Sequence, residues 1–136
     1  MKELSELTKN IYLWAAMGGW FFAQTFKILL NFLKKKKVEL GLYASTGGMP
    51  SAHTATVTGL ATSVGRHVGF SSATFAITVV FATVVITDAL NLRREVGLHA
   101  KELQRLTNRK FNVLSGHTPL EVLIGAMIGF VTGWFL

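Results

Sequence analysis

Two short motifs carry residue types that could perform chemistry on a phosphate group. They read Gly-Gly-Met-Pro-Ser-Ala-His at 47–53 and Ser-Gly-His-Thr-Pro-Leu-Glu at 115–121. Each motif places a histidine, His53 or His117, where a loop runs into an apolar segment. Asp88 and the run Arg93-Arg94-Glu95 lie between the two motifs. Histidines, carboxylates and arginines inside a largely apolar chain indicate phosphate chemistry at a membrane.

The first motif has the pattern of a helix start that can bind an anion. A proline such as Pro50 is favoured in a first helical turn, and the unpaired amides at a helix N-terminus bind phosphate. Gly47 and Gly48 allow the backbone to approach an anion closely. Gly48 is therefore a candidate for phosphate binding. An ordinary glycine loop before a helix, with His53 as a polar residue at the membrane surface, is the alternative.

The second motif pairs a histidine with a carboxylate. His117 and Glu121 are four residues apart and would share one face of a helix. A carboxylate bonded to one ring nitrogen leaves the other nitrogen free to act as a nucleophile or base. Gly116, directly before this histidine, is a further candidate for phosphate binding. The stretch from Thr118 to Glu121 is also a capping box with proline at the first helical position, so helix capping could be the whole role of Glu121.

Four further charged residues are candidates for binding phosphate or for holding the residues that do. Asp88 lies inside an apolar segment, where an acid is a functional candidate by default. It could instead pair with Lys27 or with an arginine. Arg93 and Arg94 could bind phosphate in a bidentate manner, or anchor the end of a membrane span. Lys27 has the same ambiguity, because a long lysine side chain can extend its charge to the membrane surface.

The composition is unusual for a small soluble domain. The chain has 136 residues, enough for one domain, and half of them are apolar. Charged residues make up 15%, against about 25% in soluble domains. The absence of cysteine excludes disulfides, thiolate nucleophiles and cysteine metal sites. The net charge is +7, but the basic clusters flank apolar runs, which favours anionic lipid headgroups over nucleic acid.

Four apolar segments predict an all-α integral membrane bundle with about four transmembrane helices, forming one membrane-embedded domain over 1–136. The segments are Ile11–Leu33, His53–Val68, Ser72–Leu92 and Pro119–Leu136, with a loop over 38–49. The second is rich in small and hydroxyl residues, so we expect it at the centre of the bundle. The fourth has glycines at 125, 129 and 133, a face for tight packing. The sequence allows a homodimer through that face.

The basic residues predict how the chain is oriented in the membrane. With four spans, residues 34–53 and 93–117 fall on one side, and they carry ten of the fourteen Lys and Arg residues. The positive-inside rule then places both motifs in the cytoplasm and both termini outside, in a bacterial inner membrane. Arginines kept for substrate binding would give the same bias. Outside the motifs, we expect His67 and His99 at the surface and the three tryptophans at membrane interfaces.

These motifs, taken in order, resemble the divergent branch of the type 2 phosphatidic acid phosphatase superfamily, which is related to acid phosphatases and vanadium-dependent haloperoxidases. The resemblance rests on residues 47–53, on the stretch from Asp88 through Arg93-Arg94-Glu95-Val96-Gly97, and on Gly-His-Thr-Pro-Leu-Glu-Val at 116–122. It runs from about Gln24 to the C-terminus. It implies a phosphatase that needs neither a metal nor a cofactor.

The resemblance also assigns roles to individual residues. Lys27 matches the lysine that opens the first motif of the superfamily, and Lys34 stands where that motif has arginine. Pro50, Ser51 and His53 match the second motif, with Ala52 in place of glycine. His117 matches the histidine of the third motif, and Glu121 replaces its aspartate.

The chain departs from the wider superfamily in two respects. A Ser-Arg pair normally precedes the histidine of the third motif, but Lys110 and Phe111 stand there. Arg93 or Arg94 is the candidate replacement for the lost cation. The chain also has about four spans, where typical lipid phosphatases of the superfamily have six.

The implied reaction is hydrolysis of a lipid phosphate monoester, of the phosphatidylglycerophosphate or phosphatidic acid type, through a phosphohistidine. His117, oriented by Glu121, would attack phosphorus, and His53 would protonate the leaving alcohol and then activate water. The charged oxygens would be stabilised by a group of binding residues comprising Lys27, Ser51, Arg93 or Arg94, and the neighbouring backbone, with Asp88 beside them. The expected partners are this lipid and the membrane, without nucleic acid.

Three alternatives remain open from the sequence. A metal-dependent lipid headgroup enzyme could use Asp88, Glu95, Glu121 and the histidines as ligands. A non-catalytic lipid-binding or scaffold protein could keep the same fold. A small transporter or channel subunit is the third alternative.

Overall fold

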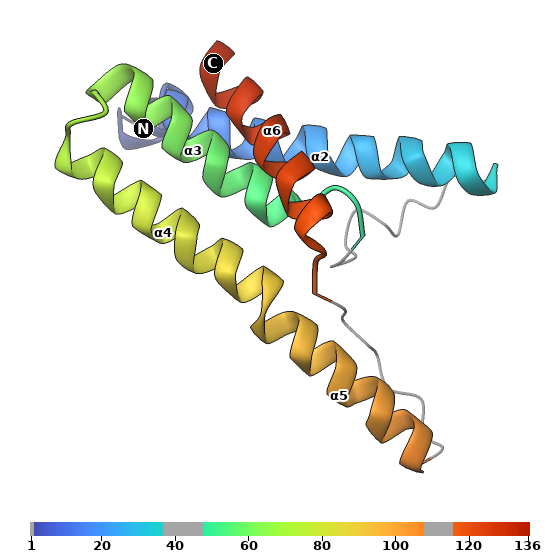
Figure 1. The fold of residues 1–136 in the computed structure, drawn as a ribbon. Helices are drawn as coiled ribbons and strands as arrows, with labels where there is room; N and C mark the ends of the chain where they lie inside the picture. The colour runs from blue at the N-terminus through green and yellow to red at the C-terminus, as the bar shows by residue number, and fades with distance from the viewer. Residues whose placement is uncertain (1, 37–47, 108–115) are drawn as a thin grey trace.

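The structure is a computed structural model, and it describes residues 2–36, 48–107 and 116–136. In these ranges the regular secondary structure is helical. The helices are α1 (Lys2–Thr8), α2 (Ile11–Lys35), α3 (Ala52–Val68), α4 (Ala73–Leu90), α5 (Leu92–Thr107) and α6 (Pro119–Phe135) (Figure 1). The predicted all-α class is confirmed for these ranges. Several positions named from the sequence lie outside the described residues, namely Lys37, Gly47, most of the loop expected over 38–49, Lys110 and Phe111.

Side-chain caps fix where four of these helices begin. Asn10 accepts hydrogen bonds from two backbone N–H groups at the start of α2. Ser51, Ser72 and Thr118 each accept one at the starts of α3, α4 and α6. Such a cap satisfies a donor that the helix itself leaves without a partner. The same residue types are visible in the sequence, and the four predicted segments agree with α2, α3, α4 and α6 to within two residues. The short helix α1 was not predicted.

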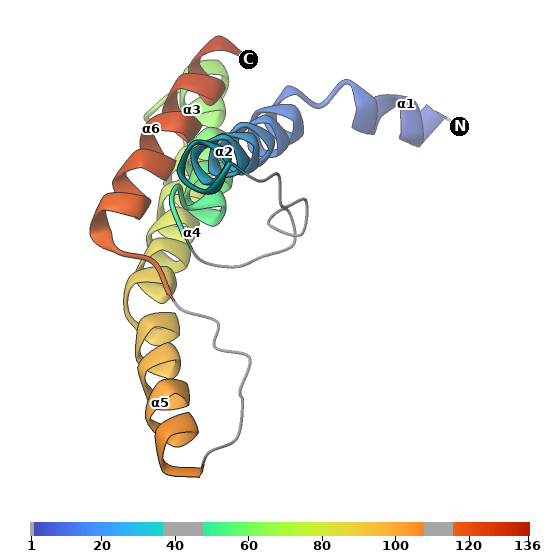
Figure 2. The same cartoon turned by 90° about the vertical axis from the view of Figure 1, so that its right-hand side faces the viewer.

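The predicted central position of the second segment is confirmed, because α3 packs against α2, α4 and α6 (Figures 1 and 2). Most residues of α3 are buried, and they are small or hydroxyl-bearing, such as Thr54, Ala55, Gly59 and Ser63. Small side chains let neighbouring backbones approach closely. A β-carbon on Gly59, for example, would lie 2.7 Å from the carbonyl oxygen of Ala15 in α2.

The glycines of α6 face α3 within the same chain. A β-carbon on Gly125, Gly129 or Gly133 would collide with the carbonyl oxygen of Ser51, Ala55 or Gly59 of α3, respectively. The two helices are therefore in contact at a separation that only glycine permits. The expectation that this glycine face forms a homodimer is wrong, because α3 already covers it.

The helices α4 and α5 form one long arm, Ala73–Thr107, with Asn91 at the joint. Within the described ranges, this arm is the one helix that is both long and apolar enough to cross a membrane, whereas α6 is apolar but has 17 residues. Beyond the joint, α5 leaves the bundle and packs against no described helix except α4 (Figures 1 and 2). The helical arm thus continues beyond the predicted third segment as far as Thr107.

Candidate functional site

The first turns of α3 and α6 meet at one end of the bundle, and this brings the two sequence motifs together. The backbone N–H of Ser51 donates to the carbonyl oxygen of Glu121 at 3.0 Å. Gly125 lies against the carbonyl group of Ser51 without room for a side chain. Before this contact the chain passes through Gly48, whose φ of +81° favours glycine, and through a cis peptide bond between Met49 and Pro50.

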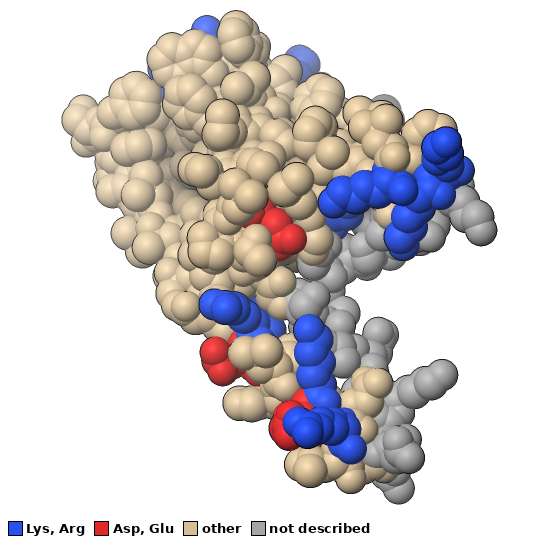
Figure 3. Space-filling view, turned by 45° about the vertical axis from the view of Figure 1, so that its right-hand side comes forward, with Lys and Arg blue, Asp and Glu red and all other residues tan. Residues whose placement is uncertain are grey.

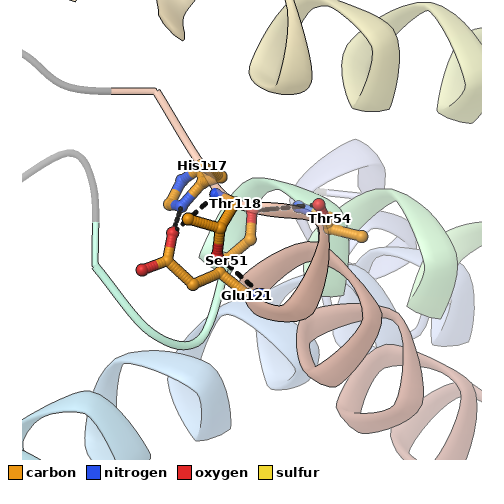
Figure 4. Close-up of polar contacts among 5 residues, drawn as sticks. All are labelled: Ser51, Thr54, His117, Thr118 and Glu121. Carbon is orange, nitrogen blue, oxygen red and sulfur yellow. Dashed lines mark hydrogen bonds and ion pairs between the residues drawn. The ribbon is translucent and has the colours of Figure 1, made fainter.

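His117 and Glu121 form the predicted pair. The Nδ1 atom of His117 lies 3.3 Å from Oε2 of Glu121 (Figure 4). The same oxygen accepts a hydrogen bond from the backbone N–H of Thr118 at 2.9 Å, which closes the predicted capping box of α6. A carboxylate acceptor holds the proton on Nδ1 and leaves Nε2 without one, as a nucleophile or base requires. His117 is buried, with 4% of its surface exposed.

Gly116 and His117, in the second of the two motifs, contact the backbone at the junction of α4 and α5. The backbone N–H of His117 donates to the carbonyl oxygen of Ala89 at 3.0 Å. A β-carbon on Gly116 would collide with the backbone of Arg94 and would lie 2.8 Å from that same carbonyl oxygen of Ala89. Gly116 therefore permits the close packing that places His117 beside the charged residues of this junction.

His53 lies in the first turn of α3 with an exposed side chain, within range of electrostatic interaction with four charged or titratable side chains. These are Arg93, His117, Lys27 and Asp88. They come from α5, from the residue before the α6 cap, from α2 and from α4. The structure thus brings the two predicted histidines to the same end of the bundle, although they are 64 positions apart in the chain.

An ion pair with Asp88 distinguishes Arg93 from Arg94. The Nε atom of Arg93 lies 2.5 Å from Oδ2 of Asp88, one of the partners expected for that acid. The charge of Arg93 acts on both His53 and His117. Arg94 is exposed, and it contributes to this region through the backbone that packs against Gly116.

Lys27 and its neighbours form a polar face of α2 toward this region. Lys27 is only 6% exposed, and its charge acts on Glu121 and on both histidines. Gln24, three residues before it, is also buried. Asn31, one helical turn after Lys27, is not among the residues predicted from the sequence. Its side-chain nitrogen is shielded from solvent and has no hydrogen-bond partner among the described residues. The spacing of four residues from Lys27 was the available signal.

Ser51 has structural contacts in addition to its predicted role. It is fully buried, and its hydroxyl oxygen accepts hydrogen bonds from the backbone N–H and the hydroxyl of Thr54 (Figure 4). Its own backbone N–H is used by Glu121, as described above. Ser51 therefore fixes the start of α3 and its contact with α6. Its contribution to phosphate binding remains a prediction, as does that of Gly48 and Gly116.

Burial sets the protonation state of His117. Removal of water lowers the pKa of His117 below its ordinary value of about 6.5, because burial disfavours the charged ring. The hydrogen bond and the negative charge of Glu121 oppose this effect, and the positive charges of Lys27 and Arg93 add to it. The ring is therefore neutral at pH 7 and can act as a nucleophile.

Basic side chains surround this end of the bundle on one face of the molecule (Figure 3). Lys34 and Lys35 lie in the last turn of α2, and four cations lie on α5, namely Arg93, Arg94, Lys101 and Arg105. All six are exposed. Such a surface suits an anionic ligand or anionic lipid headgroups. In the part of the chain that the structure describes, no group of three or more His, Asp or Glu side chains is arranged to hold a metal ion.

Residues 8–132 match the model of the divergent PAP2 family, a range that includes every candidate residue of the site. The chain belongs to the divergent PAP2 family. The predicted membership is therefore confirmed. This divergent PAP2 protein is similar to the uncharacterized membrane protein YuiD of Bacillus subtilis strain 168. The two sequences are 32% identical over 147 aligned residues, which cover 93% of each chain. No solved structure gives a significant match.

Proposed function

We propose that this divergent PAP2 protein is an integral membrane phosphatase that hydrolyses a phosphate monoester of a membrane lipid, of the phosphatidylglycerophosphate or phosphatidic acid type. The observation that carries the proposal is the pairing of His117 with Glu121 beside His53, Lys27 and Arg93. The similarity to a membrane protein and the family's relation to PAP2 phosphatases support it.

The proposed domain has four spans, α2, α3, α4 and α6. They contain 25, 17, 18 and 17 residues, within the range of about 17–25 that a membrane span needs. Large apolar side chains are exposed on the outer faces of three of them, for example Phe22, Phe81 and Phe130. With alternating directions, the site and the basic ends of α2 and α5 lie on one side. The positive-inside rule makes that side the cytoplasm of a bacterial inner membrane.

The reaction would proceed in two steps. First, Nε2 of His117 attacks phosphorus, the bond to the lipid oxygen breaks, and protonated His53 donates its proton to that oxygen. Then a water molecule gives its proton to His53 and attacks the phosphohistidine, which releases inorganic phosphate and restores both rings. Acid–base catalysis of this kind contributes roughly 10²–10⁴-fold to the rate.

Positive groups would stabilise the charge on the phosphate oxygens, which is typically the larger contribution. Lys27 and Arg93 are the two cations whose charge acts on both His53 and His117. The ion pair with Asp88 would orient the guanidinium of Arg93. The amide nitrogen of Asn31 would add a neutral donor.

The test is phosphate release in proteoliposomes from a panel of lipid phosphates. His117→Ala and His53→Ala should each lower turnover at least about 10²-fold. His67→Ala and His99→Ala are matched controls, because both histidines are exposed and lie outside the cluster, and they should retain turnover. Full activity of His117→Ala or His53→Ala refutes the role of that residue. Vanadate, which mimics five-coordinate phosphorus, should inhibit.

Two outcomes would favour the alternative functions. Loss of turnover on addition of a chelator, restored by a divalent metal, would indicate a metal-dependent enzyme. Binding of lipid phosphate that is equal in wild type and His117→Ala, with no phosphate released by either, would indicate a lipid-binding or scaffold protein.

A further inference from the structure

An open apolar groove lies between α2 and α6, next to the candidate site. Its volume is about 780 Å³, within the range of about 300–1,000 Å³ typical of ligand pockets. Apart from Thr132, its lining is apolar, and the residues that define its walls are Phe22, Phe26, Ile124, Met127, Val131 and Phe135. The groove is therefore suited to hydrocarbon and not to a second polar group.

Along both helices, one end of the groove lies close in sequence to a charged residue of the candidate site. Ile124 is three residues after Glu121, so the two lie on neighbouring turns of one face of α6. On the other wall, Phe26 directly precedes Lys27. A phosphate held near Glu121 and Lys27 would therefore leave any attached chain at the mouth of the groove.

The length of the groove agrees with the depth of one membrane leaflet. Along α6 it extends from Ile124 to Phe135, which is about 16 Å at 1.5 Å per residue. The hydrocarbon core of a bilayer is about 30 Å thick, so one leaflet is about 15 Å deep. The groove thus starts on the site side of α6 and continues to the opposite end of that helix, so a lipid chain that enters beside the site would lie in the half of the groove nearer the site.

We propose that this groove binds one hydrocarbon chain of a lipid whose phosphate occupies the site at His53 and His117. The assignment rests on the proposed function for the position of the phosphate. Lipid tails are as apolar as the groove, so the groove by itself adds little affinity. The phosphate must therefore hold the lipid in place, and occupancy of the groove should depend on the phosphate.

A photoactivatable lipid tests this dependence. The full chain is reconstituted in phosphatidylcholine vesicles with phosphatidic acid that carries a diazirine in the middle of one chain. The control probe is diacylglycerol with the same diazirine chain. After brief illumination, labelled residues are mapped by mass spectrometry. We expect the phosphatidic acid probe to label Phe22, Phe26 and Met127 at least about tenfold more than the control probe does, since one hydrogen bond to a charged group is enough for that factor.

Two substitutions on α6 provide a matched pair. Met127→Trp fills the groove, whereas Leu123→Trp places the same side chain off the groove at a residue of similar exposure, 57% against 61%. Met127→Trp should reduce groove labelling and raise the KM for phosphatidic acid without changing hydrolysis of the soluble p-nitrophenyl phosphate. Leu123→Trp should change neither quantity.

The outcomes separate this assignment from the proposed function. Phosphate-dependent labelling in a protein that releases no phosphate would refute the phosphatase and leave the groove assignment standing. Equal labelling by the two probes, in a protein that does release phosphate, would refute the groove assignment alone.

Discussion

Oε2 of Glu121 lies 3.3 Å from Nδ1 of His117 and also accepts the backbone N–H of Thr118. One carboxylate oxygen therefore closes the capping box of α6 and orients the histidine that precedes the helix. From the sequence, capping and orientation were alternative roles for this carboxylate. In the structure they are two contacts of the same atom, and they can be separated by mutation.

Glu121→Gln and Thr118→Ala should separate these two contacts. The amide oxygen of glutamine can still accept from the N–H of Thr118, but the negative charge beside His117 is lost. We expect turnover to fall about tenfold to a hundredfold, the effect of a hydrogen bond to a charged group, with little change in unfolding temperature. Thr118→Ala removes the other half of the capping box and should cost about 1 kcal/mol of stability with turnover kept. Thermal unfolding in detergent and phosphate release measure both effects, and the reverse pattern would contradict this division.

The sequence predicted the all-α class and the positions of four helices, and it singled out the two histidine motifs that the structure brings to one end of the bundle. Caps such as Ser51 and Thr118 are local signals, so the helix starts were readable. The spacing of the glycines in α6 predicted a face for tight packing, but which surface they face is a tertiary property, and the homodimer that the sequence allowed through this face is wrong because α3 covers it. Likewise, periodicity did not distinguish Arg93 from Arg94, because the ion pair with Asp88 depends on how α4 joins α5.

The pH dependence of the proposed reaction should reflect the lowered pKa of His117. The nucleophile must be neutral, so activity is lost as pH falls through this pKa, which burial holds below about 6.5. Because Glu121 raises the pKa of His117, Glu121→Gln should move the acid limb of the kcat/KM profile to still lower pH. The measurement is phosphate release from a lipid phosphate between pH 4 and pH 8, roughly the range over which histidines titrate. A limb that moves to higher pH in Glu121→Gln would rule out His117 as the titrating group.

Replacing Arg93 should lower kcat/KM for the lipid phosphate, whereas replacing Arg94 should not. Arg93 is held by Asp88, and its charge acts on both histidines, so Arg93→Gln removes a cation from the proposed phosphate site. A charge-assisted hydrogen bond contributes about 1.5–3 kcal/mol, so kcat/KM should fall about tenfold to a hundredfold. Arg94→Gln, a change of the same type at the next residue, should leave kcat/KM nearly unaltered. Equal losses in the two variants would mean that the general positive charge of this arm, and not Arg93 itself, is needed.

Asn31 should show opposite effects on stability and substrate binding. Its side-chain nitrogen is shielded from solvent without a partner among the described residues, which is unfavourable in the protein without substrate. Asn31→Leu removes this donor at similar volume and should raise the unfolding temperature. If the nitrogen binds a phosphate oxygen, the same change should raise KM about fivefold, the effect of one neutral hydrogen bond. An unchanged KM in a stabilised variant would show that Asn31 has no part in binding.

Two glycine substitutions should test whether the contact between α6 and α3 holds the two histidine motifs together. A β-carbon on Gly129 would collide with the backbone of Ala55 at the centre of the bundle, and a backbone atom cannot rotate away. Gly129→Ala should therefore cost about 1–3 kcal/mol, typical of overpacking, despite the higher helix propensity of alanine. Gly18→Ala is the matched control, because its β-carbon would meet only the side-chain ends of Thr132 and Leu136, at 3.0 and 3.2 Å.

We expect Gly18→Ala to be neutral or stabilising by up to about 1 kcal/mol, since alanine is favoured over glycine within a helix. Gly129→Ala should also lower turnover at temperatures where the protein remains folded, because separating α6 from α3 strains the hydrogen bond between Ser51 and Glu121 that joins the two motifs. Thermal unfolding and phosphate release of both variants in the same vesicles provide the comparison. If Gly129→Ala were as stable and as active as Gly18→Ala, the helices would not be in the close contact described here, and His53 and His117 would need another means of being held together.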